Sequence, residues 1–377
     1  MQAVGDPTTP ESPDPSAAAP DSLSGSEEHR RAAVRITLVA VIIICAIAAF
    51  NAYADPLGSV RSGRYRVTSS PWVDRIYKME RLRGLKKPPD VLLLGSSTTI
   101  DMSPTDVQSI SGKSAFNAAV NNGSPLDTYL IDSYMHERFG HRAPPVVLGL
   151  DVGLLDTVQP NVAIIQDPDL RRQLPLDERI RAYAGIYQPL FDLRRVPISI
   201  RALKRGRSKP LPSLDEMFEK DGFPAVERSV LGNVGIGGWD VFGARIHQNI
   251  DAGSFPRLDR EQLRMFRRFV KLENDNGVVP TVYLTPVHES RLHPERLKSD
   301  PNYEYWKDWN IRRREAVKLL KKEQKHHKFR FYDFTNVKSF GGDPEGFDDV
   351  LHMNRSNLQL LMRELERRGA YDRTPTS

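Results

Sequence analysis

Val91-Leu92-Leu93-Leu94-Gly95-Ser96-Ser97-Thr98 places four apolar residues directly before a glycine and three hydroxylated side chains. A short apolar run bounded by small residues is typical of a buried strand in a parallel sheet. In open α/β folds, ligands bind at the carboxyl edge of such strands. A sharp turn at Gly95 would therefore present a serine at that edge, although the same residues are also typical of an ordinary turn.

Short apolar runs and amphipathic stretches alternate from residue 88 onward. This order predicts a parallel sheet with crossover helices. The predicted strands cover residues 91–94, 115–120, 146–151, 278–284 and 329–333, and the predicted helices begin at Pro104 behind Ser103 and cover 125–139, 258–276, 303–324 and 354–368. The predicted fold class is α/β, a three-layer α/β/α domain over 88–370 with a mostly parallel sheet. Residues 155–257 break the pattern with proline, glycine and basic clusters, which predicts an insertion or cap.

The N-terminal part of the chain has a different composition. Residues 1–29 contain several prolines and few large apolar side chains, which predicts a disordered leader. Residues 34–54 are mostly apolar and reach the roughly 20 residues that cross a bilayer, so we predict one transmembrane helix. A cleaved signal peptide ending at Ala52-Tyr53-Ala54 is the alternative, but its leader would be unusually long. Residues 55–87 would then form a membrane-proximal segment.

Basic residues flank the predicted transmembrane helix on both sides. They are Arg30, Arg31 and Arg35 before it and Arg61, Arg64 and Arg66 after it. Orientation follows the basic residues close to the ends of a helix. The nearer cluster precedes the helix and predicts a single-pass protein of the cell membrane, with a cytoplasmic N-terminus and an extracytoplasmic main domain.

Charge and cysteine content narrow the function only slightly. The chain has 54 basic and 48 acidic residues, and this small excess is weak evidence for a nucleic-acid partner, so none is predicted. Its one cysteine, Cys45, allows no intrachain disulfide. We find no spacing typical of a metal site or a nucleotide loop, so no metal or other cofactor is predicted. A basic run at 204–209 could meet anionic lipid or a polyanionic glycan, or be a solvated loop.

Asp349-Val350-Leu351-His352, near the end of the chain, could supply the other half of a hydrolytic site. An aspartate three residues before a histidine can orient the imidazole as a general base. Ser97 and His352 are far apart in the sequence, so only the fold could bring them together. Alone, each motif is as well explained by a turn or a surface histidine.

Four short blocks, in this order, resemble those of the SGNH (GDSL-like) hydrolases. They are Leu94-Gly95-Ser96-Ser97, Phe116-Asn117-Ala118-Ala119-Val120-Asn121-Asn122-Gly123, Leu148-Gly149-Leu150-Asp151 and Asp349-Val350-Leu351-His352. The apolar helix followed by Asn51-Ala52-Tyr53-Ala54-Asp55-Pro56 is similar to the membrane-tethered branch, which includes SGNH-like proteins of alginate acetylation and teichoic acid D-alanylation. In that branch Gly-Ser-Ser replaces Gly-Asp-Ser. The resemblance covers about 88–155 and 278–368 and implies a flavodoxin-like arrangement of the sheet.

The resemblance also implies roles. Ser97 would be the nucleophile, because it stands in the serine place while Ser96 stands in the aspartate place. His352 would be the base and Asp349 its orienter. The backbone amides of Ser97 and Gly123 would donate to an oxyanion, although Gly123 is also a natural turn residue.

Three further residues are candidates for the pocket. Family enzymes often place an asparagine at the position of Asp151 as an oxyanion donor, and an ionised aspartate is an acceptor only. Three explanations of Asp151 remain open: it is protonated, it points elsewhere, or the site is weakened or repurposed. The alternative is a strand-end aspartate that bonds to nearby backbone amides. His288 follows the end of a predicted strand at the same edge and could contact an acyl acceptor or stand in a polar loop. Asn117 could line the same edge.

The leading hypothesis is a membrane-anchored esterase or O-acyltransferase that uses Ser-His-Asp covalent catalysis. Its substrate would be an acylated or acyl-accepting cell-surface glycan, and a membrane acyltransferase is a candidate partner that supplies the acyl donor. The alternative is a weak or inactive module that binds a glycan or a membrane partner. A cytoplasmic phosphatase or nuclease is a third hypothesis, which the absence of a metal-ligand pattern disfavours.

Overall fold

The computed structural model describes residues 22–54, 73–155, 164, 167–206, 214–225, 259–293, 303–348 and 351–373 of the 377-residue chain. The predicted disorder of residues 1–21 and the predicted orienter Asp349 lie outside the described residues.

The described residues contain a sheet of five parallel strands. These are β1 (Val91–Gly95), β2 (Ala115–Asn117), β3 (Val146–Leu150), β4 (Thr281–Leu284) and β5 (Arg330–Asp333), arranged in the order β2-β1-β3-β4-β5. This is the flavodoxin-like order, in which the direction of winding reverses between β1 and β3. Ligands of such sheets bind at the carboxyl ends of the two strands beside that reversal.

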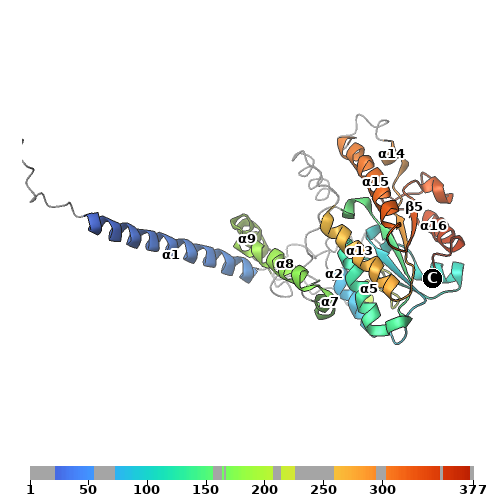
Figure 1. The fold of residues 1–377 in the computed structure, drawn as a ribbon, viewed down its shortest axis with the longest axis horizontal. Helices are drawn as coiled ribbons and strands as arrows, with labels where there is room; N and C mark the ends of the chain where they lie inside the picture. The colour runs from blue at the N-terminus through green and yellow to red at the C-terminus, as the bar shows by residue number, and fades with distance from the viewer. Residues whose placement is uncertain are drawn as a thin grey trace, which may run out of the picture.

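Helices cover both faces of the sheet, which gives three α/β/α layers (Figure 1). Side chains alternate along β1, so Leu92 and Leu94 join one buried cluster while Val91 and Leu93 join the other. The first cluster includes side chains of α2 (Val73–Gly84), α5 (Pro125–Phe139), α13 (Arg260–Asp275) and α15 (Tyr303–Glu323). The second includes α4 (Pro104–Ser111) and α16 (Arg355–Arg367). The predicted α/β class and parallel sheet are confirmed.

Two predicted strands are longer than the observed ones. β4 begins at Thr281 rather than at 278, directly after Pro280, whose nitrogen has no hydrogen to donate to a neighbouring strand. β2 ends at Asn117 rather than at 120. There the Asn117 side chain accepts the amide of Ala119 at 3.1 Å, although the amides of Ala118 and Val120 still donate to the β1 carbonyls of Leu93 and Gly95.

The apolar N-terminal helix is present and is longer than predicted. α1 spans Ser22–Ala54, so residues 22–29 are helical although they were predicted to be disordered. Growth of an existing helix is cooperative, so the apolar helix can extend toward the N-terminus. Glu27 in the extension and Arg31, one turn later, form an ion pair at 3.1 Å. The segment Glu27–Ala54 is long and apolar enough to cross a membrane. It extends away from the α/β domain (Figure 1).

The second half of the predicted membrane-proximal segment belongs to the domain itself. Residues 73–84 form α2, in which Arg75, Lys78 and Leu82 are buried. The start of the domain therefore lies before residue 88.

The described part of the predicted insertion is mainly helical. It contains α7 (Pro168–Gln173), α8 (Leu176–Tyr187), the short 3-10 turns η3 (Gln188–Phe191) and η4 (Leu193–Arg195), α9 (Val196–Arg205) and α10 (Leu214–Met217). α7 packs on α5, whereas η3 and α9 pack on α1. This part of the insertion thus joins the domain to the apolar helix.

Candidate active site

The turn after β1 places two neighbouring serines in different environments. Ser96 is buried and caps the short helix α3 (Ser97–Ile100), because its Oγ accepts the amide of Thr98 at 3.4 Å. Ser97 begins that helix and is half-buried. The predicted choice of Ser97 over Ser96 is consistent with these environments, since only the Ser97 hydroxyl remains accessible at the sheet edge.

Glycines allow the turn to lie directly on the sheet edge. Gly95 has a φ of +145°, which disfavours a side chain, and a Cβ there would collide with the Thr99 side chain and the carbonyl of Gly149. A Cβ at Gly149 would meet Thr99 as well. The turn that carries Ser97 can therefore lie between the ends of β1 and β3.

The structure brings Ser97 and His352 together. The Oγ of Ser97 lies 3.0 Å from Nε2 of His352, within hydrogen-bond distance. His352 is buried except for a small exposed fraction, whereas Ser97 is open to solvent on one side. A hydroxyl in contact with an imidazole is the arrangement in which a histidine can take the serine proton.

The loop that carries His352 is held by a buried amide of α16. The Asn357 Nδ2 donates to the carbonyl of Gly346 at 2.8 Å, and its Oδ1 accepts the amide of Asp343 at 2.8 Å. The carbonyl of His352 accepts the amide of Asp348 at 2.8 Å. These bonds fix the backbone on which the imidazole is mounted.

Asp151 follows β3 and lies near the same imidazole. Its Oδ1 accepts the amide of Gly153 at 2.9 Å, which is the strand-end role considered for it. Burial raises the pKa of Asp151, while the Gly153 amide and the charge of His352 act in the opposite direction. The carboxyl group therefore stays protonated to higher pH than an ordinary aspartate, and a protonated carboxyl can donate a hydrogen bond.

Two other predicted pocket residues have structural partners. The amide of Gly123, an expected oxyanion donor, donates to the carbonyl of Val120 at 2.9 Å. Asn117 is fully buried, and its Nδ2 lies within 3.0 Å of the carbonyls of Thr99, Ile100 and Met102. Asn117 thus holds the end of the helix that begins with Ser97 and does not line a pocket.

His288 lies beside the His352 loop. Its ring meets the ring of Phe347 edge to face, with centroids 5.6 Å apart. Phe347 forms an antiparallel bridge to Met353, the residue after His352. Nothing in these contacts assigns His288 to an acyl acceptor.

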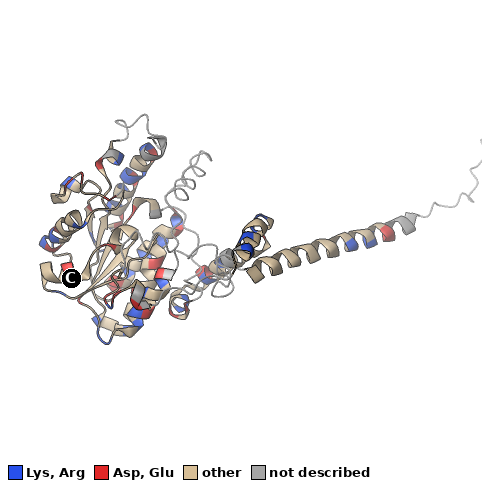
Figure 2. Cartoon of the chain, turned by 180° about the vertical axis from the view of Figure 1, so that it is seen from behind, with Lys and Arg blue, Asp and Glu red and all other residues tan. Residues whose placement is uncertain are grey.

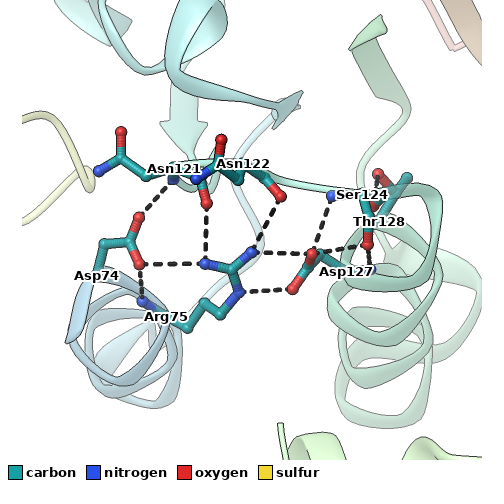
Figure 3. A network of polar contacts seen from close by, with 7 residues as sticks. All are labelled: Asp74, Arg75, Asn121, Asn122, Ser124, Asp127 and Thr128. Atoms are coloured by element: carbon teal, nitrogen blue, oxygen red, sulfur yellow. Dashed lines mark hydrogen bonds and ion pairs between the residues drawn. The ribbon is translucent and has the colours of Figure 1, made fainter. Parts of the chain in front are cut away.

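A buried arginine stabilises the loop between β2 and α5 (Figure 3). Arg75 Nε and Nη2 donate to the two carboxylate oxygens of Asp127 at 2.7 and 3.0 Å. Its Nη1 and Nη2 donate to the carbonyls of Asn121 and Asn122 at 3.0 and 3.3 Å, and Nη1 also reaches Asp74 at 3.4 Å. All five N–H groups of the guanidinium are used in this way.

The loop held by Arg75 lies against the nucleophile turn. A Cβ on Gly123 would collide with the carbonyl of Gly95. Sequence reasoning missed Arg75, because charged residues of an amphipathic helix normally face solvent. Its partner was accessible to sequence reasoning, since Ser124 and Asp127 form a capping box at the start of α5.

Lys78 makes a second buried link between α2 and this region. Its Nζ donates to the carbonyl of Asn117 at 2.6 Å and to the carbonyl of Gly222. Burial lowers the pKa of Lys78 to about 7, although nearby carboxylates, led by Asp74, act against this shift. The buried cations of α2 therefore bind both the last residue of β2, through Lys78, and the loop that follows β2, through Arg75.

Three ionisable side chains meet between α5 and α13, away from the serine. His136 Nε2 lies 2.7 Å from Glu273 Oε1 and 3.6 Å from Asp132 Oδ1, and all three side chains are buried. Their ligand atoms lie within 4.8 Å of one another, so they could hold a metal ion, although the sequence predicted no such site. Burial, reinforced by the Glu273 carboxyl, raises the pKa of Asp132 well above its ordinary value.

No protein-family model and no curated protein sequence matches this chain. The case for the site therefore depends on its geometry.

Proposed function

We propose that this protein is a membrane-anchored, SGNH-like serine esterase or O-acyltransferase. The observation that carries the proposal is the 3.0 Å contact between Ser97 Oγ and His352 Nε2. It occurs beside the winding reversal of a sheet with flavodoxin-like order, where ligands of such sheets bind. The block resemblance gives the same two residues the roles of nucleophile and base.

The proposed reaction is a double displacement. His352 takes the hydroxyl proton of Ser97 as Oγ attacks the carbonyl carbon of an ester. The bond to the leaving oxygen then breaks, and that oxygen receives the proton from His352. Water or a glycan hydroxyl then gives its proton to His352 and attacks the carbonyl carbon of the acyl-serine. The bond between that carbon and Oγ breaks, and His352 returns the proton to Ser97 Oγ. Asp349 is proposed to orient the imidazole, as the resemblance implies.

The anchor suggests where the substrate is. α1 is proposed to hold the domain on the extracytoplasmic side, because Arg30, Arg31 and Arg35 precede its apolar segment closely. A cell-surface glycan is then within reach as acyl acceptor or ester substrate. A membrane acyltransferase is proposed as the partner that supplies acyl groups if the reaction is a transfer.

Labelling with a fluorophosphonate probe tests the proposal directly. The purified full chain in detergent should be labelled and should hydrolyse p-nitrophenyl acetate, whereas Ser97→Ala should do neither, because the variant lacks the hydroxyl that contacts His352. Ser96→Ala is the matched control: it removes a cap worth about 1 kcal/mol but leaves the nucleophile, so labelling persists. Absence of labelling and turnover in the wild-type protein would contradict the esterase proposal for simple esters.

A second proposal is a weak or inactive binding module. It is favoured by the oxyanion side of the site, where the Gly123 amide is bonded to Val120 and Asp151 accepts a hydrogen bond from Gly153. Under this second proposal, the protein would remain folded and fail to react with the probe, but it would still bind a glycan or a membrane partner. The labelling experiment separates the two proposals.

The raised pKa of Asp151 predicts a pH-dependent difference between wild type and Asp151→Asn. A neutral Asp151 can donate to an oxyanion, but as pH rises through its raised pKa the carboxylate forms and repels that charge. The asparagine remains a donor at every pH. The ratio of p-nitrophenyl acetate turnover, Asp151→Asn over wild type, should therefore rise by about tenfold as the pH passes upward through the raised pKa of Asp151. A constant ratio would mean that Asp151 does not face the developing charge.

A further inference from the structure

Part of the insertion packs against the C-terminal end of α1. The Asn51 side chain is buried: its Nδ2 donates to the carbonyls of Leu190 and Asp192 at 2.8 and 3.3 Å, and its Oδ1 accepts the hydroxyl of Ser199 at 2.8 Å. The contacting segment is residues 188–205, which comprise η3, η4 and α9 and which we call the collar. The collar is therefore fixed to the helix by polar contacts that an isolated transmembrane helix would lack.

The length of α1 places the collar at the depth of the bilayer surface. Arg35 directly precedes a run over residues 36–50 that is apolar except for Thr37, and from Arg35 to Asn51 the helix is about 24 Å long at 1.5 Å per residue. The hydrocarbon core of a bilayer is about 30 Å thick. If α1 crosses a membrane with Arg35 at one boundary of this core, Asn51 lies about 6 Å short of the opposite boundary. The collar beside Asn51 is then level with the outer acyl chains, next to the headgroups.

The collar exposes large apolar side chains that nothing in the described residues covers. Phe191, Leu193 and Ile200 are 54%, 65% and 41% exposed. Three such side chains lie within ten residues of chain, whereas singly scattered exposed apolar residues are normal on soluble surfaces. Their position beside the end of an apolar helix matches that of side chains inserted into the interface of a bilayer.

The charges of the collar complement a lipid surface. Arg194, Arg201 and Lys204 are exposed, and Arg194 pairs with the carboxylate of Asp192 at 3.1 Å. Figure 2 shows basic residues on α9 beside the C-terminal end of α1. The central turns of α1 carry no charge. Basic side chains flanking inserted apolar ones are attracted to the phosphates of anionic lipids.

We propose that the collar is a second membrane-binding element that lies in the headgroup layer around α1. Phe191, Leu193 and Ile200 enter the outer acyl chains, and Arg201 and Lys204 contact lipid phosphates. This proposal requires α1 to span the membrane and is independent of any catalytic activity. The collar then sets the height of the α/β domain above the bilayer, because α8 leads from it to α7, which packs on the domain.

Depth-dependent fluorescence quenching tests the collar in the full chain. In a Cys45→Ala background, single cysteines replace Phe191, Leu193 or Ile200 and carry a bimane fluorophore. Each variant is placed in phosphatidylglycerol nanodiscs that contain lipids with a nitroxide either near the headgroup or deep in the acyl chain. Ile42→Cys reports on the middle of α1, and Arg367→Cys is the exposed control on α16 of the domain. We expect about twofold quenching at the three collar sites by the headgroup nitroxide and at Ile42 by the deep nitroxide, and none at Arg367 by either.

The controls separate the possible failures. Quenching at Ile42 without quenching at the collar would overturn the proposal and leave the anchor intact; a collar that binds a protein instead of lipid would give this result. An unquenched Ile42 would overturn the anchor and the proposal together. Replacing phosphatidylglycerol by phosphatidylcholine, or introducing Arg201→Glu with Lys204→Glu, should reduce collar quenching about twofold. Unchanged quenching at the collar sites would overturn the proposed contact between the basic side chains and lipid phosphates.

Discussion

Replacing His352 by alanine should lower the rate of Ser97 acylation by on the order of 10⁴-fold or more, as loss of the base does in serine hydrolases. The hydroxyl of Ser97 lies 3.0 Å from the imidazole, which we propose as its proton acceptor, and without that acceptor the neutral serine is a poor nucleophile. The rates of fluorophosphonate labelling and of p-nitrophenyl acetate turnover measure this loss.

His326→Ala is the matched control for that experiment. His326 is exposed in the turn after α15, so its removal should leave both rates within a factor of about two. A His352→Ala variant that folds and labels at the wild-type rate would remove the general base from the proposed mechanism. Labelling at Ser97 would then have to depend on another group.

Replacing Arg75 by methionine should lower the free energy of unfolding by about 3–5 kcal/mol. The guanidinium is buried, and the carboxylates of Asp127 and Asp74 raise its pKa against the opposing effect of burial. Methionine fills much of the volume but leaves two buried carboxylates and the carbonyls of Asn121 and Asn122 without their donor. Denaturant unfolding followed by the fluorescence of buried Trp309 measures the change.

Arg367→Met controls for the loss of a charge alone. Arg367 pairs with Glu364 at 2.7 Å, but its side chain is 70% exposed, and such surface pairs contribute about 0–1 kcal/mol. Equal losses in the two variants would show that the Arg75 network is no more stabilising than a surface ion pair. A loss at Arg75 alone supports the role of α2 in holding the loop beside the nucleophile turn.

Much of the fold could be predicted because its signals are local. α5 was predicted with its observed bounds, since Ser124 and Pro125 mark its start and Gly140 follows its end. The strands followed from apolar runs, and errors were confined to their ends, as at Asn117 and Pro280. The helix extension over residues 22–29 was missed, because composition does not reveal how far an established helix grows.

The candidate site could be predicted only in part. The glycines at the ends of β1 and β3 and the choice of Ser97 over Ser96 were visible in the blocks. The amide bond from Gly153 to Asp151 was one of several open alternatives, and the Val120 partner of the Gly123 amide was not foreseen. A backbone donor is assigned only when the path of the chain is known, because every amide offers the same chemistry.

Local patterns thus sufficed for the alternation of strands and helices and for the apolar helix, whereas Ser97 and His352 were singled out by the resemblance of the blocks. The tertiary structure decided that Ser97 and His352 are in contact, that Arg75 is buried against Asp127, and that residues 188–205 pack against the end of α1. These contacts join segments distant in the chain. They depend on how loops close and on which faces pack, and residue periodicity carries information about only one element at a time.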